Sequence, residues 1–330
     1  MMDSTTDTKD HQEELENEIT DLEYRLQKAK EQLAKSNTGK TNKPSFSYPS
    51  SQSAHHYLLL LSDSALPLGS FAFSSGLESY LAHTRRGPRP GGPSSSSLRS
   101  ATPFSSFLPL SVSSYASTTL PFALAAHRDP TPDTIAELDD ALDAAIICAV
   151  GRRASVQQGR ALLAIWEKSI AAAADPGGTL EPYAEVLRSG TIATAANSSG
   201  NGSSNGGGGS GNRNGNGEED REEILPPPAS AHLAPLFGAV ASLCGLTLRQ
   251  TAYVFMLSHV KALVSAAVRA GLFGPYQAQR ILAGNEVQAL LEEVIAREWE
   301  TRVEEAGQNV PVMDLWIGRH ELLYSRIFNS

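Results

Sequence analysis

The chain has 330 residues, enough for one or two domains, and 41% of them are hydrophobic. Its formal net charge of −9 provides no basic stripe of the kind that nucleic-acid-binding proteins carry. The polar, acidic first residues do not form a basic segment followed by an apolar one, so the sequence predicts no secretory signal. Cys148 and Cys244 lie in apolar helical patterns. We expect small buried side chains in a reducing compartment, and therefore a cytoplasmic protein.

Residues 1–56 are predicted to be a polar tail. Within it, residues 11–36 carry apolar side chains at alternating spacings of four and three, which is typical of a short coiled coil. A lone charged helix is the alternative. Residues 34–41 nearly spell a phosphate-binding loop, but position 34 is alanine instead of glycine and no strand precedes it. We therefore expect no nucleotide site there.

The first folded segment is expected over residues 57–83, where an apolar run is followed by a turn and a helix. Ser75 and Glu78 have capping-box spacing at the start of that helix. In a capping box, the serine hydroxyl accepts from the amide three residues on, and the glutamate reaches back to the cap. The serines here belong to no nucleophile motif, so a cap is the favoured interpretation.

Two stretches are predicted to be disordered insertions. Residues 85–111 are rich in proline, glycine and serine, and residues 175–230 contain a long glycine, asparagine and serine run. Neither has enough apolar surface to order itself. The sequence between them favours helices, at residues 115–126, 131–150 and 153–174.

The long stretch at residues 246–272 is apolar around most of its helical circumference, which is typical of the central helix of a bundle. His259 and Lys261 interrupt the apolar run, which argues against a membrane span. His259 is expected to be a packed core imidazole. A narrow polar row containing Lys261, Ser265 and Arg269 meets either solvent or a partner chain, so these three residues are the candidate dimer or partner face.

Further helices are expected at residues 286–306 and 315–324, and no alternating strand pattern occurs at useful length. The sequence therefore predicts one all-α domain over residues 57–330, a single helical bundle interrupted by the two insertions.

The distribution of reactive side chains gives little sign of catalysis. The eight histidines form no metal-binding motif, and no carboxylate pair has acid–base spacing, so we expect no enzyme and no tightly bound cofactor. His320, next to Glu321, is a weak candidate metal ligand.

The C-terminal peptide gathers arginine and aromatic residues at a chain end. Arg319, His320, Tyr324, Arg326 and Phe328 include the residue types that anchor protein interfaces. Chain ends fray unless they dock. The peptide is therefore expected to order on a partner, with docking on its own bundle as the alternative.

Three blocks of the sequence belong together: LLLLSDSALPLGSFAFSSGLE at 58–78, residues 232–282 with the segment SHVKALVSAAVRAGLFGPYQAQRIL, and RHELLYSRIFNS at 319–330. These blocks resemble the UreF family of urease accessory proteins. The first and third are specific in combination, since neither is a generic helix pattern. The sequence departs from the family pattern at Pro275 and Asn329, and the tail and both insertions lie outside it.

The resemblance implies an all-helical, non-catalytic protein that dimerises and acts in nickel incorporation into apo-urease. Members of this family bridge UreD, also called UreH, to the GTPase UreG, and the complex handles the nickel. Carried over by position, the residues that would dock on UreD are Arg319, His320, Tyr324, Ser325, Arg326 and Phe328. Neither nucleic acid nor a membrane is an expected partner. The alternative function is a coiled-coil scaffold unrelated to urease, acting through residues 11–36.

Overall fold

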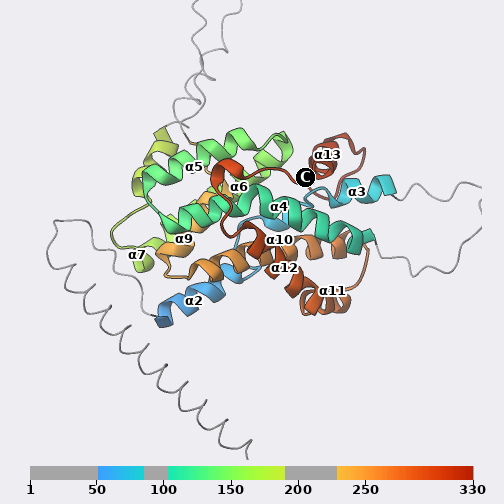
Figure 1. The fold of residues 1–330 in the computed structure, drawn as a ribbon, viewed down its shortest axis with the longest axis horizontal. Helices are drawn as coiled ribbons and strands as arrows, with labels where there is room; N and C mark the ends of the chain where they lie inside the picture. The colour runs from blue at the N-terminus through green and yellow to red at the C-terminus, as the bar shows by residue number, and fades with distance from the viewer. Residues whose placement is uncertain (1–50, 85–102, 190–228, 330) are drawn as a thin grey trace, which may run out of the picture. The chain divides into compact units, whose positions relative to one another are not determined.

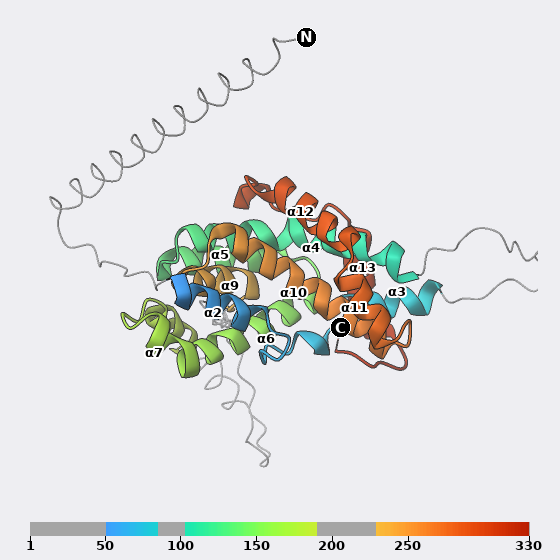
Figure 2. The same cartoon turned by 90° about the horizontal axis from the view of Figure 1, so that it is seen from below.

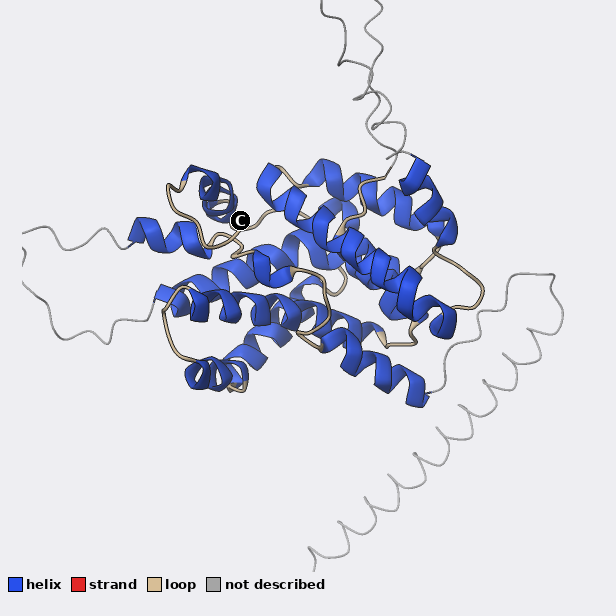
Figure 3. Cartoon of the chain, turned by 180° about the vertical axis from the view of Figure 1, so that it is seen from behind, coloured by secondary structure: helices blue, strands red, loops and turns tan. Residues whose placement is uncertain are grey.

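The computed structural model describes residues 51–84, 103–189 and 229–329. All regular elements in these ranges are helical, with no strand (Figure 3). The all-α prediction is therefore confirmed. The α-helices are α2 (Ser51–Ser62), α3 (Leu77–Thr84), α4 (Pro103–Arg128), α5 (Pro132–Ala145), α6 (Ala149–Ile165), α7 (Ala171–Ala174), α9 (Leu233–Leu243), α10 (Leu248–Arg269), α11 (Pro275–Leu282), α12 (Asn285–Glu298) and α13 (Val312–Arg319). Residues 181–189 are helical as well.

The described residues belong to one unit, Tyr48–Ser330. The other unit, Met1–Ser47, lies outside the described residues, and so do the predicted coiled coil at 11–36 and the loop-like residues 34–41. The folded part begins with α2 at Ser51, six residues before the predicted start.

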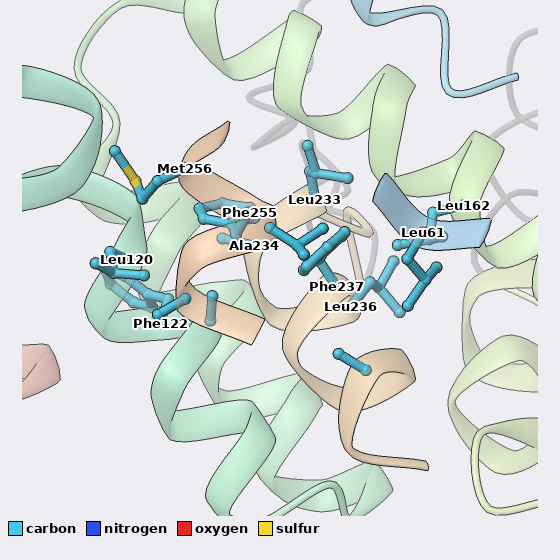
Figure 4. Close-up of a cluster of buried hydrophobic side chains, with 14 of the residues drawn as sticks. Leu61, Leu120, Phe122, Leu162, Leu233, Ala234, Leu236, Phe237, Phe255 and Met256 are labelled. Atoms are coloured by element: carbon cyan, nitrogen blue, oxygen red, sulfur yellow. The ribbon is translucent and has the colours of Figure 1, made fainter. Parts of the chain in front are cut away.

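The centre of the bundle is built by α4, α9 and α10, which pack against one another (Figure 1). Each residue of α9 is buried, because this helix is apolar on all sides. Gly238 allows the closest approach, since a Cβ at this position would lie 2.0 Å from the carbonyl oxygen of Ala123 in α4. Leu236 and Phe237 fill the space on the side of α9 that faces Leu61 and Leu162 (Figure 4).

The predicted central helix is α10, which begins at a capping box formed by Thr247 and Gln250. It runs through the middle of the bundle, between α4 and α2 (Figure 2). Among the described residues it is the one helix long and apolar enough to cross a membrane, but 56% of its most apolar stretch is buried inside the fold. The core helix of a folded bundle can have the same length and the same apolar composition.

The first predicted insertion is too long at its C-terminal end. Residues 103–111 form the beginning of α4, and Phe104 and Phe107 are completely buried there. Pro103 starts this helix at a position where a missing amide hydrogen costs nothing. The serine-rich composition and Pro109 made these residues look unlike a helix in the sequence. In the structure, both Pro109 and Pro121 lie inside the 26-residue helix.

The second predicted insertion is too long at both ends. Residues 175–189 are folded, with Leu180 and Tyr183 buried, and the Asp175 carboxylate accepts from Thr179 N at 2.6 Å. At the other end, Ala229 is buried. The carboxylate of Asp139 is also buried there, and it accepts from the backbone amides of residues 230, 231 and 232. Buried apolar side chains and this carboxylate order residues that composition alone assigned to the insertion.

Two helices and one cysteine also differ from expectation. The helix α12 ends at Glu298 instead of continuing to 306, and α13 covers Val312–Arg319 instead of 315–324. Cys244 is buried as predicted, whereas Cys148 is half-buried at the N-cap of α6.

Candidate partner-binding surface at the C-terminal tail

The C-terminal tail, residues 319–329, follows α13 and lies close to α3 (Figure 1). Arg319 ends α13, a 3₁₀ turn covers His320–Leu322, and the remaining residues are not helical. The tail docks on its own bundle, which is the alternative that the sequence left open.

The carboxylate of Glu78 anchors this tail. His320 Nε2 donates to Glu78 Oε2 at 2.9 Å, Ile327 N donates to Oε1 at 2.8 Å, and Phe328 N donates to Oε2 at 3.3 Å. One carboxylate therefore holds three donors from two parts of the tail. Hydrogen bonds to an ionised acceptor are about twice as strong as neutral ones, so Glu78 is the main polar contact of this segment.

The capping-box interpretation of Glu78 is wrong. Its side chain points to the tail instead of to the start of α3, and its backbone amide faces Ser74 Oγ at 3.4 Å. Ser75 has a φ of +50°, in the left-handed region, so the chain turns sharply just before Leu77. No local signal could have revealed the role of Glu78, because its partners lie about 250 residues further along the chain.

A contact between Phe328 and Arg269 brings together two candidate sites that the sequence analysis treated separately, the C-terminal peptide and the polar row on α10. Phe328 is buried, and the Arg269 guanidinium lies 4.4 Å from its ring centroid. Arg269 also donates to the carbonyl of Phe71, and Asn329 N donates to the carbonyl of Ala72 at 2.8 Å. The tail thus packs against the end of α10 and the turn before α3, so the blocks that carry the family resemblance meet in space.

The other members of the polar row on α10 also contact their own chain. Lys261 Nζ donates to the carbonyl of Ser62 at the end of α2, at 2.6 Å. The carbonyl of Ser265 faces Arg269 Nε at 3.4 Å, and the Ser265 side chain is half-buried. The cations of this row hold α2 and the turn before α3 against α10. Its role as a dimer face stays a prediction.

His320 is completely buried, and its Nδ1 has no hydrogen-bond partner among the described residues. Its other ring nitrogen is engaged by Glu78. No group of three or more histidine, cysteine, aspartate or glutamate side chains with metal-binding geometry occurs among the described residues. Its hydrogen bond to Glu78 makes His320 part of the tail anchor in this structure.

The outer face of the tail exposes large side chains. Tyr324 is fully exposed and Leu322 almost so, and Ile327 and the nearby Phe71 are more than half exposed. Ser325 and Arg326 are exposed between them. Clusters of exposed aromatic and aliphatic side chains mark interaction sites on soluble proteins. Of the six residues predicted to contact a partner, His320 and Phe328 point into the fold, and Arg319, Tyr324, Ser325 and Arg326 face outward.

The bundle also contains a cavity of about 360 Å³, lined by His259, Ser111 and Tyr115 among others. Burial lowers the pKa of His259 to about 3, so its imidazole is neutral at physiological pH. The ring stacks on Tyr115 with centroids 4.0 Å apart, and Nε2 lies 3.1 Å from Ser111 Oγ. This agrees with the packed core imidazole that the sequence led us to expect.

Comparisons with known proteins identify the family. A family model described as UreF matches residues 98–286. An uncharacterized urease accessory protein UreF-like from Schizosaccharomyces pombe is 32% identical over 283 residues, which cover 85% of this chain and 99% of that protein. Urease accessory protein F from Oryza sativa subsp. japonica is 27% identical over 81% of this chain and 82% of its own length. The corresponding protein of Arabidopsis thaliana is also 27% identical, over 82% and 90%. The chain belongs to the UreF family of urease accessory proteins.

Proposed function

We propose that this protein is a helical adaptor in urease maturation, which joins UreD (UreH) to the GTPase UreG so that the complex delivers nickel to apo-urease. Family membership supports a role in maturation. The relatives are named as accessory proteins and not as enzymes, which supports an adaptor without catalysis of its own. In this proposal the protein acts in the cytoplasm as a homodimer, and the assembled complex handles the nickel without a tightly bound cofactor in this chain.

The observation that carries this proposal is the way the tail presents its apolar side chains. Glu78 and the buried Phe328 fix the tail from inside, so Leu322, Tyr324 and Ile327 are held outward on an ordered backbone. A fixed backbone reduces the entropy lost on binding. Aromatic side chains in such positions are frequent anchors of protein interfaces. The outward face of the tail therefore suits UreD as its partner.

Co-purification with UreD tests this proposal. We expect the double variant Leu322→Ala, Tyr324→Ala to stay folded and to lose capture of UreD, because both side chains are exposed. The matched control is Tyr276→Ala, which removes an equally exposed tyrosine from α11. A shorter chain that ends before Asp314 should also fail to capture UreD. Full capture by the double variant would contradict the proposed role of the tail.

The alternative function, a coiled-coil scaffold, makes the opposite prediction for the first part of the chain. Deleting residues 11–36 would then abolish partner capture, whereas little should change if the tail carries the interaction.

Measuring the nickel content of each component of a complex with UreD and UreG tests which chain holds the metal. Sedimentation of a Lys261→Ala, Arg269→Ala variant tests whether the α10 row forms the dimer face.

A further inference from the structure

A second surface is separate from the outward apolar face of the tail. It is an open groove of about 910 Å³ between α6 and the tail. Four arginines line it: Arg152, Arg153 and Arg160 from α6, and Arg326 from the tail. Since the whole chain has a net charge of −9, this is a local concentration of positive charge on an acidic protein.

The acidic residues in the groove leave part of this charge unpaired. Asp143 lies 3.5 Å from Arg152, and Glu321 pairs with Arg153. Arg326 is exposed and contacts no acceptor among the described residues. The Nε of Arg152 is buried and also has no acceptor there. Four guanidinium groups thus face two carboxylates, which leaves an excess of hydrogen-bond donors and positive charge.

Backbone carbonyls fix two of these arginines in place. Arg152 donates to the carbonyl of Ile146 at 2.9 Å, and Arg160 Nε donates to the carbonyl of Ser230 at 3.2 Å. A guanidinium has five N–H groups, so each keeps donors available for a ligand. Arginines held in this way lose little further side-chain freedom on binding, and their planar forks match carboxylates.

The groove also has apolar lining residues, which distinguish it from a site that binds only a small anion. Phe73, Val150 and Phe328 line it from beneath as buried side chains, and Val156 is half-buried at its surface. A free phosphate is much smaller than this groove and gains nothing from apolar contact. A peptide that carries acidic side chains around an aliphatic one fits both the charge and the walls.

We propose that the arginine groove binds an acidic peptide segment of a partner protein. The carboxylates pair with Arg153, Arg160 and Arg326, and an aliphatic side chain lies against Val156. This inference does not depend on the identity of the partner that binds the outward face of the tail.

Fluorescence anisotropy with the full chain and a labelled, glutamate-rich peptide that contains a central leucine pair tests this inference. We expect salt-sensitive binding, since screening weakens exposed charge pairs. Arg326→Gln should weaken it about fivefold and Arg153→Gln by a similar factor, in line with exposed ion pairs. Because Arg326 has no partner among the described residues, its substitution leaves the fold intact. Arg280→Gln on α11 is the control with the same charge change, and it should bind normally.

Any of the following outcomes would overturn the inference. The first is that the peptide does not bind. The second is that Arg153→Gln and Arg326→Gln bind as tightly as Arg280→Gln. The third is that a peptide with glutamine in place of glutamate binds equally well, or that pyrophosphate displaces the acidic peptide as effectively as an unlabelled copy does. The fourth is binding only after removal of the chain's own acidic run at residues 218–223, which would make the groove an internal contact.

Discussion

His320 and Glu78 are 242 residues apart in the chain, and their side chains meet at 2.9 Å. His320 is completely buried and Glu78 nearly so. The same carboxylate accepts from the amides of Ile327 and Phe328. One residue of the first helical segment therefore decides where the last residues of the chain lie, and with them the exposed face that we propose for partner capture.

Glu78→Gln is expected to loosen the tail without unfolding the bundle. Glutamine keeps one acceptor oxygen but loses the charge, and its NH2 group cannot accept from Ile327 N or Phe328 N, whichever of them it faces. A hydrogen bond to a charged group contributes about 1.5–3 kcal/mol, against about 1 kcal/mol for a neutral one. We expect hydrogen exchange at Ile327 and Phe328 to accelerate about tenfold, which corresponds to ~1.4 kcal/mol. Glu137→Gln, exposed on α5, is the control and should leave these amides unchanged.

Phe328→Ala is expected to release the tail from the end of α10. The substitution removes a buried ring and its contact with Arg269. Because a chain end can open by itself, the free energy of global unfolding should change by less than about 1 kcal/mol, while the tail becomes accessible to proteases. Limited proteolysis with mass spectrometry measures this. Tyr324→Ala, in which an exposed ring is removed, should be cleaved no faster than the unmodified chain. Equal cleavage of both variants would show that Phe328 does not hold the tail.

Gly238→Ala is expected to destabilise the whole bundle. The added Cβ would lie 2.0 Å from the carbonyl oxygen of Ala123, so α4 and α9 must move apart. Overpacking of this kind costs about 3 kcal/mol when backbone has to shift. Chemical denaturation should report this loss. At Gly307 an added Cβ meets no atom within 4 Å, so Gly307→Ala should change stability by less than about 0.5 kcal/mol. A stable Gly238→Ala variant would contradict the close contact between these helices.

The stability of the bundle is expected to fall as the pH drops below 6.5, with His259 as one cause. Burial lowers its pKa from 6.5 to about 3, so between these values the unfolded chain binds a proton that the folded chain does not. Stability is therefore complete above pH 6.5 and decreases towards pH 3. At pH 5 the loss from this residue is about 1–2 kcal/mol.

His259→Gln keeps a polar side chain near Ser111 but cannot be protonated. The difference in unfolding free energy between pH 7 and pH 5 should therefore shrink by about 1–2 kcal/mol in this variant. Some pH dependence should remain, because burial also lowers the pKa of His127. An unchanged difference would mean that His259 is not the buried neutral group that the structure indicates.

The sequence by itself determined the fold class, the family and the central helix. Apolar periodicity is a local property, and around α10 it is strong enough to predict a core helix without knowledge of its neighbours. The family was visible from short blocks at 58–78 and 319–330, since their residue order is specific. Composition was a poorer guide to the bounds of the insertions. It did not predict that α4 begins at Pro103 or that residues 175–189 are folded, because these residues are ordered by burial against the rest of the bundle.

Only the tertiary structure decided the roles of the side chains that hold the tail. From the residue spacing alone, Glu78 was predicted to cap a helix, and Arg269 was predicted to belong to a polar row that meets solvent or a partner chain. Both instead hold the C-terminal residues, because folding brings the end of α10, the start of α3 and the tail together. A hydrogen bond or a cation–π contact depends on distance in space, and the sequence separation of these residues gives no measure of it.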